Sequence, residues 1–192
     1  TRIQAAVQQM TQLIDEVLTF ERVEDGRLAC DLRELAIEPF CCRALDDMQL
    51  LAGERHVLAF SFQGSSGTAW LDEQLLRFIL SNLVGNAVKY SPEGGTVSLQ
   101  ASCDGTTAQF IVRDEGIGIP SSELGQVFDS FFRGSNVGSV GGTGMGLSIV
   151  RKCVEMHHGK LEIDSVEGEG TAITILLPAC PTSTGDDAIT AI

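Results

Sequence analysis

Three glycine clusters in the second half of the chain restrict its backbone more than any other feature. Residues 116–118 follow a strand-like segment, residues 141–146 precede a helix-like segment, and residues 168–170 separate two strand-like segments. One such cluster is weak evidence, because glycine turns are common. The second cluster is more informative, since glycines allow close approach and the amide groups of a following helix favour a bound phosphate.

Composition and charge restrict what such loops can bind. The chain has 192 residues and is 43% hydrophobic, which is enough to fill a core and excludes wholesale disorder. Its net charge of -13 predicts that it repels nucleic acid and anionic membranes. Any polyanion must therefore be bound locally, by backbone amides, a metal ion and a few basic side chains.

Apolar periodicity divides the chain into three parts. Residues 1–27 begin with one uninterrupted amphipathic helix. Its stripe of apolar side chains can be buried only against another helix or domain. Residues 28–180 mix helix and strand patterns without strict alternation, which predicts an α+β sandwich of one mixed sheet and a layer of helices. Residues 181–192 have the composition of a disordered tail.

The central part contains eight segments with clear patterns. We expect helices over residues 37–51, 71–90 and 147–157, and strands over residues 57–62, 96–101, 109–113, 160–164 and 171–177. Gly159 is expected to end the third helix as its C-cap. Residues 134–146 are rich in glycine and serine, which is typical of a mobile lid over a ligand.

One helix presents a polar face with possible chemistry. Asn82, Asn86 and Lys89 lie together at spacings of four and three on the predicted helix 71–90, opposite its apolar stripe. An ordinary solvated surface would explain them equally well. However, two asparagines on one helical face are unusual, an amide oxygen can ligate magnesium and a lysine can pair with phosphate.

The six cysteines form no CxxC pair, and most have apolar neighbours. This pattern favours buried, reduced thiols, with redox sensing as the alternative. No signal peptide or apolar run of membrane-spanning length is present, so we expect a cytoplasmic location, either independently or as the cytoplasmic part of a membrane sensor.

Taken in order, the polar helix and the glycine clusters resemble the nucleotide-binding boxes of sensor histidine kinases. The similar segments are the N box at residues 82–90, the first glycine box at Asp114-x-Gly116-x-Gly118, the F box at residues 128–133, the second glycine box at Gly144-x-Gly146, and the third at Gly168-x-Gly170-Thr171. The resemblance covers residues 28–178. It implies the Bergerat ATP-binding sandwich shared with gyrase, Hsp90 and MutL-type ATPases.

The resemblance implies that ATP binds with Mg²⁺ and assigns roles by position. Asn86 is expected to ligate magnesium, with Asn82 and Lys89 facing the phosphates. Asp114 is expected to accept the amino hydrogen bond of adenine, with Thr171 assisting through water. The remaining expected binding residues are Tyr90 beside the base, Gly116 and Gly118 leaving space for it, and Gly144, Gly146 and Leu147 cradling the phosphates.

Two departures from the family pattern matter. Ser130 stands where the F box often has a basic residue, and Arg133 is the remaining candidate for stabilising the transferring phosphoryl group. The phosphoacceptor histidine is absent, because His56, His157 and His158 all lie outside residues 1–22. The resemblance makes residues 1–22 the second helix of the dimerisation hairpin, which forms a four-helix bundle in a homodimer.

The resemblance therefore predicts a protein-histidine kinase whose partners are an acceptor-histidine helix and a response regulator receiver domain. An ATP-hydrolysing machine of the same fold is an alternative. It is disfavoured because those ATPases carry a glutamate where this chain has Asn82, and an amide cannot act as a base at neutral pH. A nucleotide-binding regulatory module without kinase activity is the other alternative.

Overall fold

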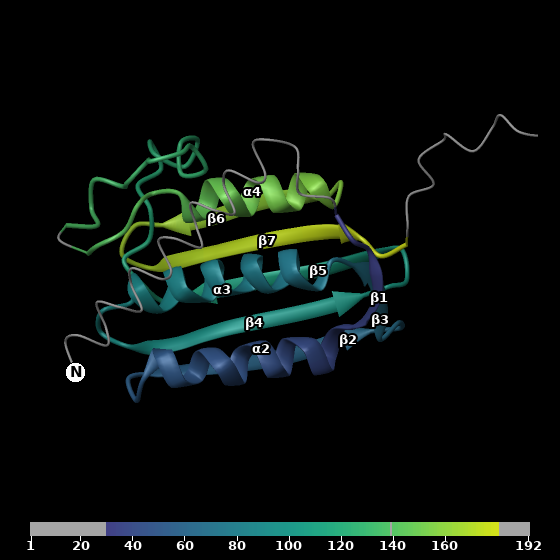
Figure 1. Ribbon diagram of the computed structural model, residues 1–192. Coiled ribbons are helices and arrows are strands. Elements are labelled where there is room, and N and C mark those ends of the chain that lie inside the picture. Colours follow the sequence, from purple (N-terminus) through teal and green to yellow (C-terminus); the bar gives the residue numbers. More distant parts are fainter. Residues whose placement is uncertain (1–29, 139, 181–192) are drawn as a thin grey trace, which may run out of the picture.

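The computed structural model describes residues 30–138 and 140–180 (Figure 1). Their elements are β1 (Arg33–Ala36), α2 (Ile37–Ala52), β2 (His56–Gly64), β3 (Thr68–Leu71), α3 (Glu73–Lys89), β4 (Gly95–Cys103), β5 (Thr107–Asp114), α4 (Gly146–Met156), β6 (Lys160–Val166) and β7 (Gly170–Pro178). The helix predicted over residues 1–22 and the tail predicted over residues 181–192 lie outside the described residues.

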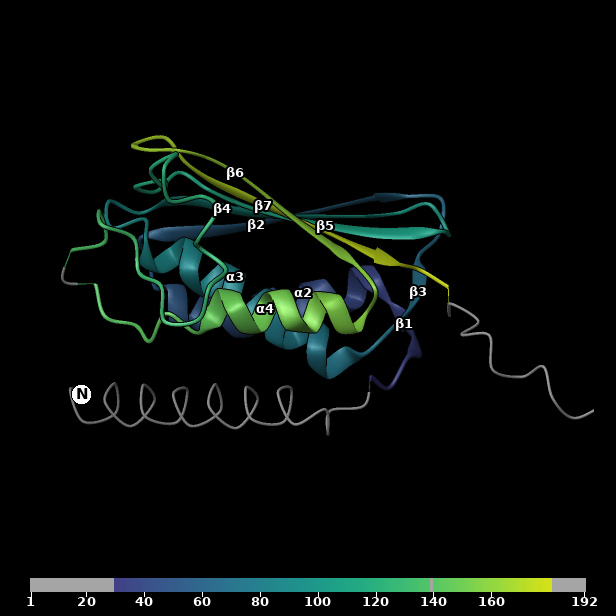
Figure 2. The ribbon, with the colours of Figure 1, turned by 90° about the horizontal axis from the view of Figure 1, so that it is seen from above.

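The main sheet has five strands in the order β2-β4-β5-β7-β6. The β2–β4 pair is parallel and the other three pairs are antiparallel, so the sheet is mixed. Figure 2 shows α2, α3 and α4 together on one face of this sheet. The predicted α+β sandwich is thereby confirmed.

The core lies between these two layers. In β4 the alternate residues Val97, Leu99 and Ala101 are buried, as expected for a strand with one covered face. The helix α3 faces them with its predicted apolar stripe, Leu76, Ile79, Leu80, Leu83 and Ala87, all of which are buried. Each large side chain buried in this way contributes about 1.5–3 kcal/mol. Burial of this stripe fixes the orientation of α3 about its own axis, and with it the direction in which the polar face points.

The start of α3 differs from the prediction, because Leu71 belongs to a strand. Residues 68–71 form β3, which pairs with β1 in a separate two-stranded sheet. Asp72 then ends the strand and caps the helix, since its Oδ1 accepts hydrogen bonds from the backbone N–H groups of Gln74 and Leu75 at 2.9 and 3.0 Å. Strands of four residues are too short to show a clear alternation, which is why both were missed.

The end of α4 also corrects a prediction. The C-cap is His157, and the following left-handed residue is His158, with φ of 56°, instead of Gly159. The N–H groups of His158 and Gly159 donate to the carbonyls of Glu155 and Val154, both at 2.9 Å, as in a Schellman motif. Gly159 is needed for another reason: a Cβ there would lie 2.5 Å from the Leu176 carbonyl oxygen.

All six cysteines of the chain are free thiols that differ in burial. Cys41, Cys103 and Cys153 are buried, and Cys30 is partly buried. Burial raises the pKa of the Cys41 and Cys153 thiols to about 12, which suppresses their thiolate forms. Cys42 and Cys180 are exposed, so the expectation of buried thiols fails for them. No helix within the described residues combines the length and apolar character needed to cross a membrane.

Candidate functional site

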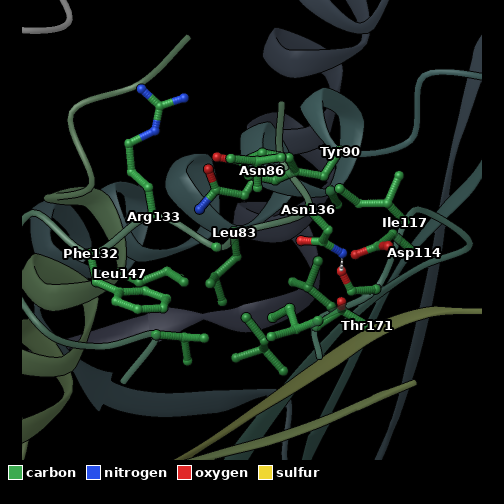
Figure 3. A pocket seen from close by; sticks show the side chains of 18 residues that line it. Leu83, Asn86, Tyr90, Asp114, Ile117, Phe132, Arg133, Asn136, Leu147 and Thr171 are labelled. Atoms are coloured by element: carbon green, nitrogen blue, oxygen red, sulfur yellow. Dashed lines mark hydrogen bonds between the residues drawn. The ribbon is translucent and has the colours of Figure 1, made fainter. Parts of the chain in front are cut away.

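One cavity contains most of the residues that the sequence singled out. It lies beside the C-terminal half of α3 and the adjoining ends of β5 and β7, and the loop between β5 and α4 forms its remaining wall (Figure 3). The predicted residues that line it are Asn86, Tyr90, Asp114, Gly118, Arg133, Leu147 and Thr171. These residues come from α3, β5, the loop between β5 and α4, α4 and β7, so only folding brings them together.

The carboxylate of Asp114 marks one end of the cavity. Asp114 is the last residue of β5 and pairs with Thr171 of β7, so the sheet register sets both positions. Its Oδ1 accepts a hydrogen bond from the backbone N–H of Gly116 at 2.9 Å. Burial raises the pKa of Asp114, while the backbone N–H groups of Gly116 and Thr171 act in the opposite direction. The side chain is a fixed hydrogen-bond acceptor in a mostly apolar wall.

Close backbone contacts explain two of the predicted glycines. A Cβ at Gly116 would collide with the Tyr90 carbonyl oxygen and lie 2.8 Å from Ser91 Oγ. Gly118 has φ of 62°, and a Cβ there would collide with the Val166 carbonyl oxygen. These glycines press the first glycine loop against the end of α3 and the β6–β7 turn. The structure thus gives them a packing role beside any role in leaving space for a ligand.

The polar face of α3 is divided between the cavity and the glycine-rich segment before α4. Asn86 and Tyr90 line the cavity, whereas Asn82 and Lys89 do not. Asn82 Nδ2 donates to the Phe78 carbonyl at 3.0 Å, and its Oδ1 lies against Gly146. The Lys89 ammonium lies 4.8 Å from the centroid of the Tyr90 ring and close to Gly142 of the loop.

The opposite end of the cavity is formed by three residues that flank the loop before α4. Phe132, Arg133 and Leu147 line it, and Figure 3 shows them on the side away from Asp114 and Thr171. The exposed Arg133 guanidinium donates to the Val140 carbonyl at 2.6 Å, so it is engaged with its own loop. Ser130 is exposed and does not line the cavity.

The second glycine box joins this loop to α4. Gly144 has φ of 74° and lies against the backbone of Phe131 and Phe132, outside the cavity lining. Gly146 begins α4, whose N-cap Met145 supplies no side-chain hydrogen bond to the first turn. The N-terminal amide groups of α4 therefore suit an anion at this end of the cavity.

Sequence reasoning missed several residues of the cavity, and Asn136 is the most informative. Its Nδ2 donates to the Gly118 carbonyl at 3.0 Å, and the bond is drawn in Figure 3. The neighbouring Ser135 N–H donates to both carboxylate oxygens of Glu123 at 3.1 and 3.3 Å. A single asparagine in a glycine- and serine-rich loop carries no periodic signal, so nothing in the sequence marked it.

All three histidines lie within the described residues, and none of them lines the cavity. His56 is buried, with Nε2 2.9 Å from the Ser91 carbonyl oxygen. His157 is buried, its Nε2 accepts from the Asp72 N–H at 3.1 Å, and burial lowers its pKa. His158 follows it at the end of α4. The two buried rings are occupied by structural hydrogen bonds.

Comparisons with known proteins agree with this arrangement. Residues 71–181 match the family model "Histidine kinase-, DNA gyrase B-, and HSP90-like ATPase". The Circadian input-output histidine kinase CikA of Synechococcus elongatus is 34% identical over 88% of this chain and 23% of its own length. Sensor histidine kinase WalK of Bacillus subtilis is 30% identical over 91% of this chain and 29% of its own length.

A solved structure extends the similarity to three dimensions. Full-length ShkA in complex with AMPPNP shares 28% sequence identity and superposes with a TM-score of 0.79. The match covers 93% of this chain and 38% of that chain. The present chain thus spans less than a third of the two curated relatives and well under half of the solved one.

Proposed function

Because the chain belongs to the family of histidine kinase-, DNA gyrase B- and HSP90-like ATPases, we propose that it binds Mg-ATP and transfers the γ-phosphoryl group to a histidine. The main observation behind the proposal is that Asp114, Asn86 and Arg133 line the same cavity. It combines a fixed carboxylate at one end with an amide and a guanidinium toward the other. A purine with an exocyclic amino group and a phosphate chain requires that distribution of acceptor and donors.

Asp114 and Thr171 would bind the adenine. The carboxylate is acceptor-only when ionised, so it suits an amino group and disfavours a carbonyl at the same place. The apolar residues Val112, Ile117 and Ile173 line the same cavity and suit the faces of a base. Tyr90 would pack near the base, and Gly118 would leave space for it.

Asn86 would hold Mg²⁺ through its amide oxygen. Magnesium prefers oxygen ligands, keeps several waters and is commonly shared between one or two protein groups and substrate phosphates. Within the described residues, no group of three or more His, Cys, Asp or Glu side chains could hold a metal ion. A single amide oxygen beside phosphate oxygens fits that chemistry, and the bound ion would neutralise phosphate charge.

The transfer itself would depend on positioning and charge. The attacking histidine nitrogen forms a bond to the γ-phosphorus while the bond to the leaving ADP oxygen breaks. Arg133, Lys89 and Asn82 would face the phosphates. Gly144, together with Gly146 and Leu147 of the first turn of α4, would cradle them. Arg133 would first have to release the Val140 carbonyl. Hydrolysis is disfavoured because Asn82 cannot activate water.

The proposal requires an acceptor from outside this cavity, because none of the three histidines lines it. We propose the acceptor-histidine helix of the same kinase as the phosphoryl acceptor and a response regulator receiver domain as the next partner. The parent would be a homodimer, and this region would lie in the cytoplasm.

The proposal is tested by incubating the chain with radiolabelled ATP and Mg²⁺, alone and with a panel of acceptor-histidine fragments from kinases that it resembles. We expect no acid-labile label on the chain by itself and label on at least one fragment. Removing Mg²⁺ with a chelator should abolish that label. Label on the isolated chain that disappears in His157→Ala or His158→Ala would contradict the assigned acceptor.

The second candidate function is a nucleotide-binding regulator. It is favoured by the Arg133–Val140 bond, which keeps the guanidinium engaged with its own loop. Tight ATP binding by calorimetry together with no label on any fragment, even at high concentration, would select this alternative.

A further inference from the structure

The hydroxyl of Ser165 on β6 contacts three hydrogen-bonding partners among the described residues, although Ser165 itself does not line the cavity. Its Oγ lies 2.9 Å from each of the Ile119 backbone nitrogen, the Gly170 carbonyl oxygen and Thr171 Oγ1. The sheet sets this arrangement, because Thr171 stands opposite Asp114 of β5 on one side and opposite Ser165 on the other. Ser165 therefore contacts the cavity wall through Ile119 and Thr171, both of which line the cavity.

The three partners of Ser165 leave one way to place the hydroxyl hydrogens. A serine hydroxyl donates one hydrogen bond and can accept two. The Ile119 N–H can only donate and the Gly170 carbonyl can only accept, so the single hydrogen of Ser165 points to Gly170. The contact with Thr171 is then a hydrogen bond only if Thr171 is the donor. The Thr171 hydroxyl consequently has only its lone pairs to offer to the cavity.

This assignment makes the wall around Asp114 a surface of hydrogen-bond acceptors. Thr171 lines the cavity beside the Asp114 carboxylate, as Figure 3 shows. An ionised carboxylate also accepts without donating. A ligand edge bound here must therefore supply hydrogens, either directly or through a water molecule. The amino group of a 6-aminopurine has two hydrogens, whereas a 6-oxopurine presents an acceptor at the same position.

We propose that Ser165 is a specificity-determining positioning residue that keeps the Thr171 hydroxyl turned away from the ligand and thereby excludes 6-oxopurine nucleotides, an inference that rests on the proposed function. A threonine hydroxyl that rotates freely can accept from an amino group or donate to a carbonyl, so by itself it does not discriminate. Held by Ser165, it accepts only. A carbonyl at this place would face two acceptors and stay unpaired, which is the costly arrangement for a buried polar group.

A purely structural role for Ser165 leads to a different expectation. Its bonds to Ile119 and Gly170 hold the first glycine loop against the β6–β7 turn, together with the Gly168 N–H, which donates to the Ile117 carbonyl at 2.9 Å. Loss of this support alone would loosen the loop and weaken the binding of every nucleotide by a similar factor. The ratio of two nucleotide affinities therefore separates the two roles.

The test measures the affinities for ATP and inosine triphosphate, each with Mg²⁺, by isothermal titration calorimetry. Inosine triphosphate carries a 6-oxo group and a proton on N1 in place of the 6-amino group, so it probes this edge of the base alone. The wild type should prefer ATP. In Ser165→Ala the ratio of the two affinities should fall at least about fivefold, as for one reversed hydrogen bond. Ser165→Cys, which keeps the size of the side chain but bonds weakly, should lower the ratio in the same direction.

The matched control is Ser102→Ala. Ser102 is also a partly buried strand serine, and its Oγ donates to Gln109 Oε1 at 3.4 Å, outside the cavity lining. The variant loses a serine hydroxyl from the same sheet without touching Thr171. Its ratio of affinities should match that of the wild type.

A double-mutant cycle shows whether Ser165 acts through Thr171. Thr171→Val has no hydroxyl to orient, so adding Ser165→Ala to it should leave the ratio unchanged. A wild type without preference for ATP, equal weakening of both nucleotides in Ser165→Ala, or the same fall of the ratio in the Thr171→Val background would overturn the inference and leave the kinase proposal intact. A wild-type chain that binds neither nucleotide would instead overturn the proposed function.

Discussion

The two sides of the cavity are built in different ways. On one side, β5 and β7 are paired residue by residue, and Asp114 and Thr171 are opposite each other in the register. On the other side, residues 132–137 belong to a loop held by side-chain contacts such as Asn136 to Gly118 and Ser135 to Glu123. One side is fixed by a sheet and the other by a few replaceable hydrogen bonds.

This difference suits the two tasks that we propose. A base must be recognised by a rigid acceptor, because a misplaced carboxylate loses its hydrogen bond. A phosphate chain must enter, react and leave, so the loop beside it has to open. The few hydrogen bonds of the loop are easier to break than the continuous pairing of β5 with β7.

The largest effect is expected at the phosphate side of α3. Asn86→Ala should reduce Mg²⁺-dependent transfer to an acceptor fragment by at least about 100-fold, because it removes the proposed metal ligand. Asn86 is only partly buried, so the variant should melt like the wild type. Ser81→Ala, an exposed change on the same helix, is the control. A variant that keeps both its melting temperature and its transfer rate would remove Asn86 from the mechanism.

A smaller effect is expected at the base end. Asp114→Asn should weaken ATP binding by about 1–3 kcal/mol, as for an altered buried hydrogen bond. The exposed Asp164 on β6 offers Asp164→Asn as a control with the same change of charge. Isothermal titration calorimetry checks both. Equal ATP affinity in the wild type and Asp114→Asn would show that the base is recognised elsewhere.

Hydrogen exchange measures the contrast between the loop and the sheet directly. Without nucleotide, amides in residues 134–138 and 140–142 should exchange at least about 100-fold faster than those of β5 and β7, because few contacts hold the loop. Asn136→Ala should accelerate exchange further in residues 134–138, since it removes the bond to Gly118. Strong protection of the lid in the nucleotide-free chain would show that the loop is as rigid as the sheet.

The smallest expected effect is the pH dependence of stability. Burial raises the pKa of Asp114, so its contribution is fully present below the unfolded value of about 3.9 and is lost as pH rises through the folded pKa. Asp114→Asn removes this loss, so its stability relative to the wild type should increase as pH rises above about 4. Denaturant unfolding at several pH values measures the difference. If the difference in free energy of unfolding between the two proteins does not change with pH, the carboxylate has no net burial cost.

Local patterns were sufficient for most of the elements. The predicted stripe of α3 and the strands of both hairpins are confirmed, because burial on one face leaves a periodic signal. The start of α3 and the end of α4 were misplaced. Leu71 fits the apolar stripe of the helix as well as a strand, so its pairing in β3 became visible only in the fold. The left-handed residue after α4 is His158, where the sequence favoured Gly159.

The candidate site was predictable only in part. The ordered boxes pointed to Asn86, Asp114 and Thr171, which the structure places around one cavity. They gave no sign that Asn82 bonds to the Phe78 carbonyl or that Asn136 joins the lining. Asn136 lies in an irregular loop, where no period exists, and the Phe78 carbonyl is only one of several partners that an amide on a helix surface can take.

The sequence alone determined the fold class, the polar face of α3 and the family, because helical and strand periods and glycine turns are local properties of a chain. Only the tertiary structure decided which polar side chains face the cavity and which glycines are needed for packing. These features depend on contacts between β5, α4 and the loop that joins them. Distant contacts of this kind are fixed by packing of the whole domain, and no segment of the sequence contains them by itself.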